Sequence, residues 1–104
     1  MSKLTLFFES MKQKKVAFIG VGVTNTDIIR LFLTKGINVT LLDRKNEEQL
    51  GEIYSELKEK GVEFRLGDSY LDSLSDFDVV FRSPGMYFNH PKLAEARRNG
   101  VSVT

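Results

Sequence analysis

Short apolar runs alternate along this chain with longer stretches in which apolar residues recur at helical spacing. The short runs, rich in residues that favour strands, occupy residues 16–19, 37–42, 62–66, 78–82 and 101–104. The first is a continuous apolar run, as expected for a central parallel strand that is covered on both faces. Regular alternation of strands with helices is typical of βαβ units, so the pattern predicts a parallel sheet.

The clearest helical pattern lies between the second and third predicted strands. Leu50, Ile53, Tyr54 and Leu57 follow the spacing i, i+3, i+4 and i+7, which predicts one helix over residues 46–60. Its start carries a capping-box pair, Asn46 and Gln49, and a glycine follows its end at position 61.

Three further helices are predicted. Residues 24–35 precede Gly36, which stands where a helix would end. Another helix begins near Pro91, whose fixed φ suits a first helical position, with His90 as its cap, and ends at Gly100. Residues 1–15 predict an amphipathic helix packed on the domain edge, with apolar positions at Leu4, Phe7, Phe8 and Met11.

These elements predict a Rossmann-like, three-layer α/β/α domain with a five-stranded parallel sheet. Crossovers between parallel strands are right-handed, so the strand order is 3-2-1-4-5 if the chain reverses after the third strand. Ligands of such sheets bind at the carboxyl ends of the strands, where the order reverses. Residues 20–25, 43–45 and 83–89 are expected to converge there.

Composition narrows the class of protein. A chain of 104 residues with 41% hydrophobic and 28% charged residues fits one ordinary globular domain. The net charge of +1 gives no broad attraction to nucleic acid or anionic lipid. The absence of cysteine excludes disulfides and thiolate metal sites, and no apolar run approaches the ~20 residues of a membrane span. No feature indicates an oligomer, and we expect a monomer.

The glycine-containing segment after the first strand predicts an anion site. In residues 20–25, the glycines permit close backbone approach, so the amides of Val23, Thr24 and Asn25 and the Thr24 hydroxyl could bind a diphosphate. The alternative is a tight connection without a ligand. The third glycine of the dinucleotide fingerprint is replaced by Asn25, which counts against an NAD-type site but not against a phosphate site.

Two other segments supply candidate contacts at the same edge. Asp43 ends the second strand, where an acidic side chain commonly accepts hydrogen bonds from a ribose or a base, or instead caps the following loop. Arg44 and Lys45 follow it, either flanking a base or simply solvated. A turn that forms an opposite wall comes from Ser83, Pro84 and Gly85.

No catalytic set accompanies these candidates. There is no lysine-containing phosphate loop, no carboxylate pair on one loop and no metal-ligand spacing in the chain. For His90, a catalytic role has no local carboxylate to support it, so a capping role is favoured. The sequence predicts binding without catalysis.

At this point the motifs resemble a known family. The segment Gly20-Val21-Gly22-Val23-Thr24, the strand ending Leu42-Asp43-Arg44, and Arg82-Ser83-Pro84-Gly85 followed by His90-Pro91 are similar to the first domain of the Mur ligases, in particular the D-glutamate-adding branch. The resemblance covers residues 15–104.

The resemblance implies a role and a set of site residues. The family's first domain holds the uridine diphosphate of a UDP-N-acetylmuramoyl-L-alanine substrate in a three-domain cytoplasmic enzyme of peptidoglycan synthesis. A central domain uses ATP and magnesium to activate the carboxylate, and a third domain brings D-glutamate. Carried over by position, the UDP contacts would be Gly22, Val23, Thr24, Asn25, Asp43, Arg44, Lys45, Ser83, Pro84 and Gly85.

Two expectations and two alternatives follow. Because the chain stops within its fifth predicted strand, we expect a fragment that holds only the first domain, without cofactor or metal of its own and inactive alone. The first alternative is the NAD(P)-binding half of an oxidoreductase, or a nucleotide-sensing module. The second is a domain without a ligand that serves as a packing partner.

Overall fold

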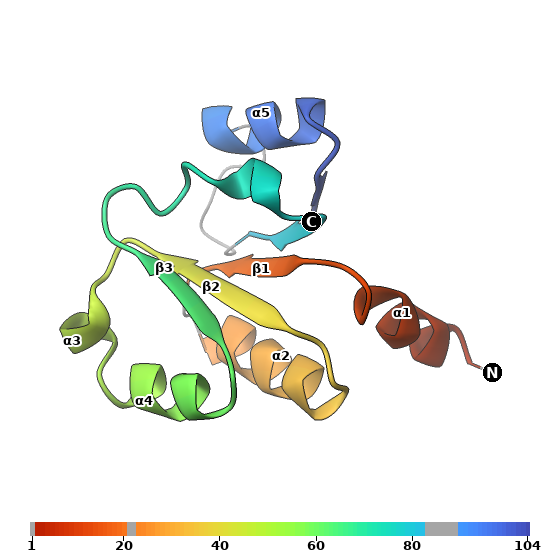
Figure 1. Cartoon of the computed structure of the whole chain (residues 1–104), viewed down its shortest axis with the longest axis horizontal. Coiled ribbons are helices and arrows are strands. Elements are labelled where there is room, and N and C mark those ends of the chain that lie inside the picture. Colours follow the sequence, from red (N-terminus) through yellow and green to blue (C-terminus); the bar gives the residue numbers. More distant parts are fainter. Residues whose placement is uncertain (1, 21–22, 83–89) are drawn as a thin grey trace.

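The computed structural model describes residues 2–20, 23–82 and 90–104, with the side chains of residues 23 and 24 left out. Within them lies a parallel sheet in the order β3-β2-β1-β4-β5, which confirms the predicted order (Figure 1). Its strands are β1 (Val16–Ile19), β2 (Val39–Asp43), β3 (Glu63–Leu66), β4 (Val79–Phe81) and β5 (Ser102–Val103).

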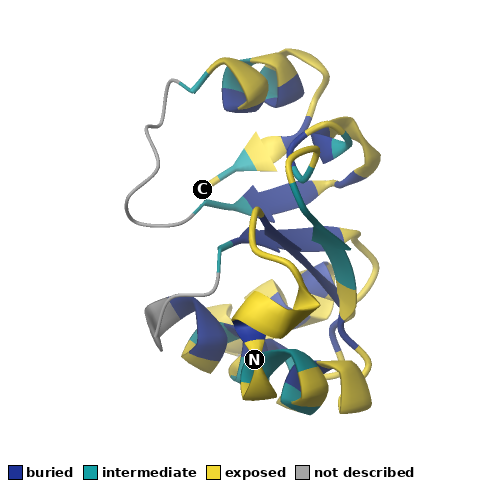
Figure 2. Cartoon of the chain, turned by 90° about the vertical axis from the view of Figure 1, so that its left-hand side faces the viewer, coloured by how far each residue is buried: buried dark blue, intermediate teal, exposed yellow. Residues whose placement is uncertain are grey.

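Helices cover both faces of this sheet, as the three-layer prediction requires. On one face lie α1 (Lys3–Met11), α2 (Val23–Thr34) and α4 (Glu52–Glu59); on the other lie a 3-10 turn, η1 (Leu74–Asp76), and α5 (Pro91–Arg98) (Figure 1). The central strands are buried, whereas β3 and β5 are partly exposed (Figure 2).

Alternate residues of each central strand serve opposite faces of the sheet. Val16 and Phe18 of β1 belong to the core cluster under α1, α2 and α4, and Ala17 and Ile19 belong to the cluster under η1 and α5. This follows from the period of two in a strand. A continuous apolar run is therefore what a doubly covered strand needs.

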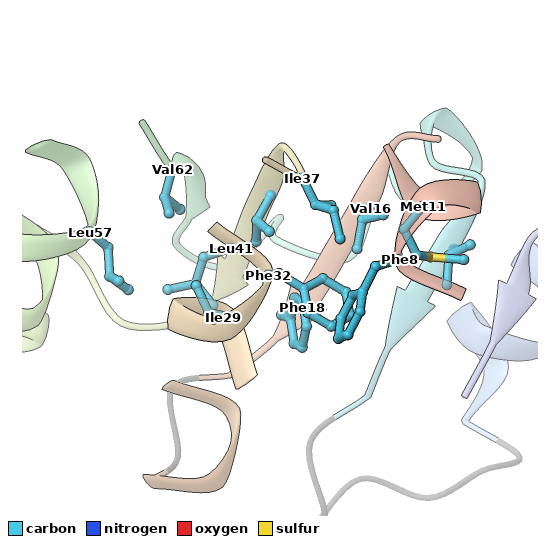
Figure 3. Close-up of a cluster of buried hydrophobic side chains, with 12 residues drawn as sticks. Phe8, Met11, Val16, Phe18, Ile29, Phe32, Ile37, Leu41, Leu57 and Val62 are labelled. Carbon is cyan, nitrogen blue, oxygen red and sulfur yellow. The ribbon is translucent and has the colours of Figure 1, made fainter. Parts of the chain in front are cut away.

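Phenylalanine rings pack together within the larger, otherwise mostly aliphatic cluster (Figure 3). The ring of Phe18 stacks on that of Phe81 with centroids 4.7 Å apart and meets the ring of Phe32 edge-on at 5.3 Å. Phe8 of α1 also contacts Phe32 edge-on, at 5.8 Å. These ring contacts pack α1 and α2 against the middle of the sheet.

The prediction of one helix over residues 46–60 was wrong. The chain forms a short helix α3 (Glu47–Leu50), then Gly51 with φ of 63° and ψ of −132°, and then α4. The positive φ of Gly51 interrupts helical geometry, and glycine adopts it without the steric cost of a Cβ atom. The capping box itself is confirmed, since the Asn46 and Gln49 side chains each accept from the other's backbone N–H.

Two other differences concern the edges of the fold. The crossover from β3 to β4 contains only η1, an element that the sequence pattern did not predict, so one face of the sheet is thinly covered beside β3. In α1, Phe8 and Met11 are buried as predicted, but Leu4 is 63% exposed, so the apolar side of this helix is only partly used.

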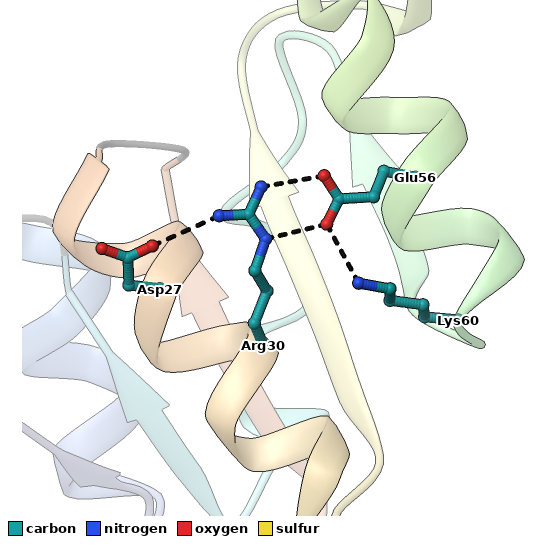
Figure 4. A network of polar contacts seen from close by, with 4 residues as sticks. All are labelled: Asp27, Arg30, Glu56 and Lys60. Carbon is teal, nitrogen blue, oxygen red and sulfur yellow. Dashed lines mark hydrogen bonds and ion pairs between the residues drawn. The ribbon is translucent and has the colours of Figure 1, made fainter.

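Helices α2 and α4 are joined across the sheet face by a polar network (Figure 4). Arg30 donates from Nε and Nη2 to the two carboxylate oxygens of Glu56, each at 2.8 Å, and Lys60 donates to the same carboxylate at 3.2 Å. Asp27 accepts from Arg30 Nη1 at 3.2 Å. Hydrogen bonds from Arg30, then Lys60, lower the pKa of Glu56 from 4.5 to about 2.

We expect acid to weaken the domain through Glu56. A folded-state pKa below the unfolded value contributes stability above pH ~4.5, and this contribution is lost as the pH falls toward ~2. The midpoint of urea unfolding should therefore drop more steeply with acidification in the unsubstituted chain than in E56Q. This difference should shrink at high salt, because the Arg30–Glu56 pair is partly exposed. D27N, in which the exposed Asp27 side chain changes but the Arg30–Glu56 pair stays, should keep the steep dependence on pH. Equal slopes in the unsubstituted chain and E56Q would contradict this account.

Candidate functional site

The exits of β1 and β2 lie side by side at the carboxyl edge of the sheet. Ile19 pairs with Leu42 in register, and the backbone N–H of Gly20 donates to the carbonyl of Leu42 at 2.8 Å. Gly20 has a φ of 86°, a left-handed value that lets the chain leave the strand sharply. Helix α2 begins at Val23, so its first backbone amides open beside the end of β1.

Asn25 ties this turn to the strand that it leaves. Its side chain is buried at 5% exposure, and Nδ2 donates to the carbonyls of Ile19 at 3.1 Å and Gly20 at 3.2 Å. The dinucleotide fingerprint would have a glycine here for close packing of helix on strand. In this chain the side-chain amide of Asn25 instead bridges α2 and the end of β1, so hydrogen bonds from this side chain hold the turn. Whether the Asn25 backbone also binds UDP stays a prediction.

Replacing Asn25 with alanine should destabilise the domain by about 1–3 kcal/mol, because two carbonyls at a buried turn lose their donor. Asn38, which is exposed, offers a matched control. The N38A variant should change the free energy of unfolding by less than about 0.5 kcal/mol. Urea unfolding of both variants measures the difference. If N25A proves as stable as N38A, the bridging role is refuted.

Asp43 closes β2 and organises the turn after it. Its side chain is buried at 8% exposure, and Oδ1 accepts from the backbone N–H of Lys45 at 2.9 Å. Its backbone carbonyl accepts from Gly67 N at 3.0 Å, which joins the exits of β2 and β3. The carboxylate therefore caps its loop, the alternative raised from the sequence. The predicted contact with ribose or base remains a prediction alongside that cap.

The other predicted contacts differ in how far the structure describes them. Arg44 and Lys45 are exposed next to Asp43. The predicted contacts Gly22, Ser83, Pro84 and Gly85 lie outside the described residues, as do the side chains of Val23 and Thr24. The structure thus brings together the exits of β1 and β2.

Sequence reasoning missed the part of this edge that β3 supplies. A hollow of about 420 Å³ next to the Asp43 turn is lined by Asn46, Glu47, Glu48, Leu66 and Gly67. The sequence did contain an indication of this contribution, because Gly67 directly follows the third predicted strand. In the structure Gly67 has a φ of 97°. A glycine after a strand commonly marks the point where a chain turns at the ligand edge.

A larger hollow, of about 660 Å³, lies at the opposite edge of the sheet, near the amino-terminal ends of β1 and β2. Two of its charged lining residues, Arg65 and Asp76, are already paired at 3.0 Å. Since parallel α/β sheets bind ligands at the carboxyl ends of strands, we assign the candidate site to the edge that carries Gly20 and Asp43.

Two further features bear on the chemistry of the chain. The Nδ1 atom of His90 accepts from the backbone N–H of Lys92 at 3.1 Å, so the histidine caps α5 as predicted. In the described part of the chain, no three His, Cys, Asp or Glu side chains gather as a metal site. No helix among the described residues is long and apolar enough to cross a membrane.

Comparison with protein families matches residues 14–104 to the Mur ligase MurD-like, N-terminal domain. The chain is 42% identical over 98 residues to the UDP-N-acetylmuramoylalanine–D-glutamate ligase of Clostridium novyi and 46% identical to that of Clostridium tetani. Each match covers 94% of this chain but 21% of the relative. The chain therefore spans about a fifth of these curated relatives.

Solved structures with a similar fold include a reductase and dehydrogenases. An imine reductase from Myxococcus stipitatus in complex with NAD+ has a TM-score of 0.57 and 16% identity, over 86% of this chain and 38% of the enzyme. A shikimate 5-dehydrogenase from Mycobacterium fortuitum has a TM-score of 0.57 and 15% identity, over 90% of this chain and 45% of the enzyme. At such identity the likeness shows the Rossmann-like fold and does not decide the ligand.

Proposed function

Because the chain belongs to the family of MurD-like amino-terminal domains of Mur ligases, we propose that it binds the uridine diphosphate part of UDP-N-acetylmuramoyl-L-alanine. In this proposal the diphosphate lies against the first amides of α2, and the ribose and uracil lie against the turn that follows Asp43. One copy of the domain binds one nucleotide, and it does so without catalysing a reaction.

One observation carries the proposal. The glycine turn after β1 and the acidic end of β2 are adjacent and joined by the hydrogen bond from Gly20 to Leu42, at the edge where the order of the strands reverses. Amides at a helix start favour an anion, and hydrogen bonds to charged groups contribute about 1.5–3 kcal/mol each. A carboxylate one strand away is spaced to accept from a sugar or base that follows a diphosphate.

The activity of the whole ligase is proposed for a longer parent protein. There the substrate carboxylate would be activated with ATP and magnesium and then joined to D-glutamate, in the cytoplasm and in the service of peptidoglycan synthesis. We assign those steps to parts of the relatives beyond the fifth of their length that this chain matches. This domain's contribution would be to hold the nucleotide end of the substrate at a fixed place.

The oxidoreductase alternative loses support for two reasons. The relatives with 42–46% identity are ligases, and Asn25 occupies the position where the dinucleotide fingerprint has its third glycine. The buried Asn25 side chain fills the junction of strand and helix, where that fingerprint requires close packing.

Titration with UDP, followed through the backbone amide signals, tests the proposal. We expect the amides of Val23, Thr24 and Asp43 to shift at millimolar UDP, since a single domain offers only part of the full ligase's contacts. UDP-N-acetylmuramoyl-L-alanine should bind at least as well as UDP.

Competition separates the alternatives within the same titration. Excess NADH should leave the UDP-induced shifts in place, whereas displacement by NADH would favour the oxidoreductase reading. A flat response to both nucleotides would reject the binding role and favour a domain that only packs against a neighbour.

A further inference from the structure

Strand β3 lies at the outer edge of the sheet, beyond β2 (Figure 1). Gly67, just after β3, donates its N–H to Asp43 of β2, and Leu66 pairs with Asp43 in the parallel register. Successive residues of a strand direct their backbone groups to opposite sides. The groups of Glu63 and Arg65 therefore face β2, and those of Phe64 and Leu66 point away from the sheet.

A hollow of about 510 Å³ runs along this outer edge. Tyr54 and Lys58 of α4 line one side of it, and Val62, Phe64 and Leu66 line the other. The ring of Phe64 lies against that of Tyr54, with centroids 4.6 Å apart. The edge thus combines outward-pointing backbone groups with a recess in which apolar side chains lie beside the charged Glu47, Lys58 and Glu63. Free backbone groups and pockets for alternate side chains are what an added strand needs.

The sequence of this edge is complementary to itself. Residues 62–66 read Val-Glu-Phe-Arg-Leu, with an acid and a base placed symmetrically about Phe64 and an apolar residue at each end. We propose that β3 is an interface for a second copy of this chain, in which two β3 strands pair antiparallel about a two-fold axis at Phe64.

The register follows from the strand geometry. Residues opposite each other share a face only when their numbers add to an even sum, and a two-fold axis at Phe64 meets this condition. Phe64 then faces Phe64 of the second copy as a hydrogen-bonded pair, because its N–H and carbonyl point outward. Leu66 faces Val62 of the second copy, and these apolar side chains enter the hollow beside Tyr54.

Charge supports the same register. Glu63 of each copy stands opposite Arg65 of the other at the non-hydrogen-bonded positions, where side chains come closest. Glu63 is exposed, and the Arg65 side chain is 39% exposed. The hydrogen bonds of Arg65, to Ser73 at 2.5 Å and Asp76 at 3.0 Å, both use Nη1, and its guanidinium also lies over the Phe77 ring, 4.8 Å from the centroid. A guanidinium has five N–H donors, so the pair across the interface does not require these contacts to break.

This inference replaces the expected monomer with a weak dimer. A strand of four residues buries less than the about 1,000 Å² typical of a stable interface, so association should need high protein concentration. The proposal does not depend on nucleotide binding, because the Gly20 turn and the two-fold axis lie on different strands, although Leu66 also lines the hollow next to the Asp43 turn.

Sedimentation velocity of the unsubstituted 104-residue chain, at protein concentrations from about 20 µM to about 1 mM, tests the association, since dimerisation follows mass action. We expect the sedimentation coefficient to rise toward the dimer value. In E63R and in R65E, like charges face each other across the interface, so each alone should associate at least about tenfold more weakly. An equimolar mixture should regain the association, because unlike charges meet in the mixed dimer.

Matched controls and a second measurement keep the outcome clear. E95R and R98E carry the same charge changes at exposed positions of α5, on the opposite face of the sheet from α4, and both should associate like the unsubstituted chain. Hydrogen exchange on the unsubstituted chain should show amides of Phe64 and Leu66 that become protected as concentration rises, independently of any variant. An unsubstituted chain that stays monomeric at about 1 mM, a mixture that fails to recover, or unchanged exchange at Phe64 would each overturn the proposal.

Discussion

Replacing Phe18 with alanine is expected to lower the free energy of unfolding by about 3–5 kcal/mol, a large share of the roughly 5–15 kcal/mol typical of a domain. Phe18 has no solvent exposure, and its ring contacts that of Phe32 (Figure 3) and stacks on that of Phe81. Truncation removes apolar burial and leaves a cavity between helix α2 and the centre of the sheet. Urea unfolding followed by circular dichroism measures the change.

Phe7 provides the control for this prediction. It is the same residue type in the same ring cluster, with centroids 6.2 Å from Phe32, but it is 39% exposed on α1. F7A should cost about 1 kcal/mol or less, because most of its surroundings can adjust or are solvent. Comparable losses in F18A and F7A would show that the Phe18 cluster does not dominate the stability of the domain.

Replacing Asp43 is expected to weaken UDP binding by about 10- to 100-fold, the equivalent of roughly 1.4–2.8 kcal/mol for a hydrogen bond to an ionised acceptor. The prediction rests on the proposed function. D43N keeps an oxygen that can cap Lys45 N–H and loses only the charge, whereas D43A loses the cap as well. We expect both variants to bind UDP poorly, and only D43A to lose about 1 kcal/mol of stability.

Pyrophosphate distinguishes the proposed contacts in the same titration. Its affinity should be equal or slightly higher in D43N, because the carboxylate repels an anion and is proposed to contact only the nucleoside. Lys14→Ala, at the opposite edge of the sheet, serves as the unaffected control for both ligands. UDP affinity that is unchanged in D43N and D43A would reject the assignment of the nucleoside to the Asp43 turn.

Local sequence patterns were sufficient for much of this fold. The apolar run of β1, the capping pair Asn46 and Gln49, and His90 before Pro91 each depend on residues a few positions apart. Their structures are set by strand pleat, helix period and hydrogen bonds to the nearby backbone. The order of the strands followed from the nearly constant handedness of crossovers together with the assumption that the chain reverses after the third strand.

The candidate site was only partly predictable. The sequence indicated that Gly20 and Asp43 end adjacent strands, and the structure brings those strand exits together. It did not indicate that Gly67 would join the Asp43 carbonyl, because that contact depends on how β3 registers against β2. The proposed contacts at residues 83–85 lie outside the described residues and stay predictions.

The sequence by itself determined the five strands and where most of the helices lie, because alternation and helical period are properties of neighbouring residues. Only the tertiary structure decided that the helical pattern breaks at Gly51, that Asn25 bonds back to the end of β1, and that Arg30 reaches Glu56. Each of these outcomes is selected by packing between elements. Residues 26 positions apart, such as Arg30 and Glu56, meet only after the sheet has brought their helices side by side.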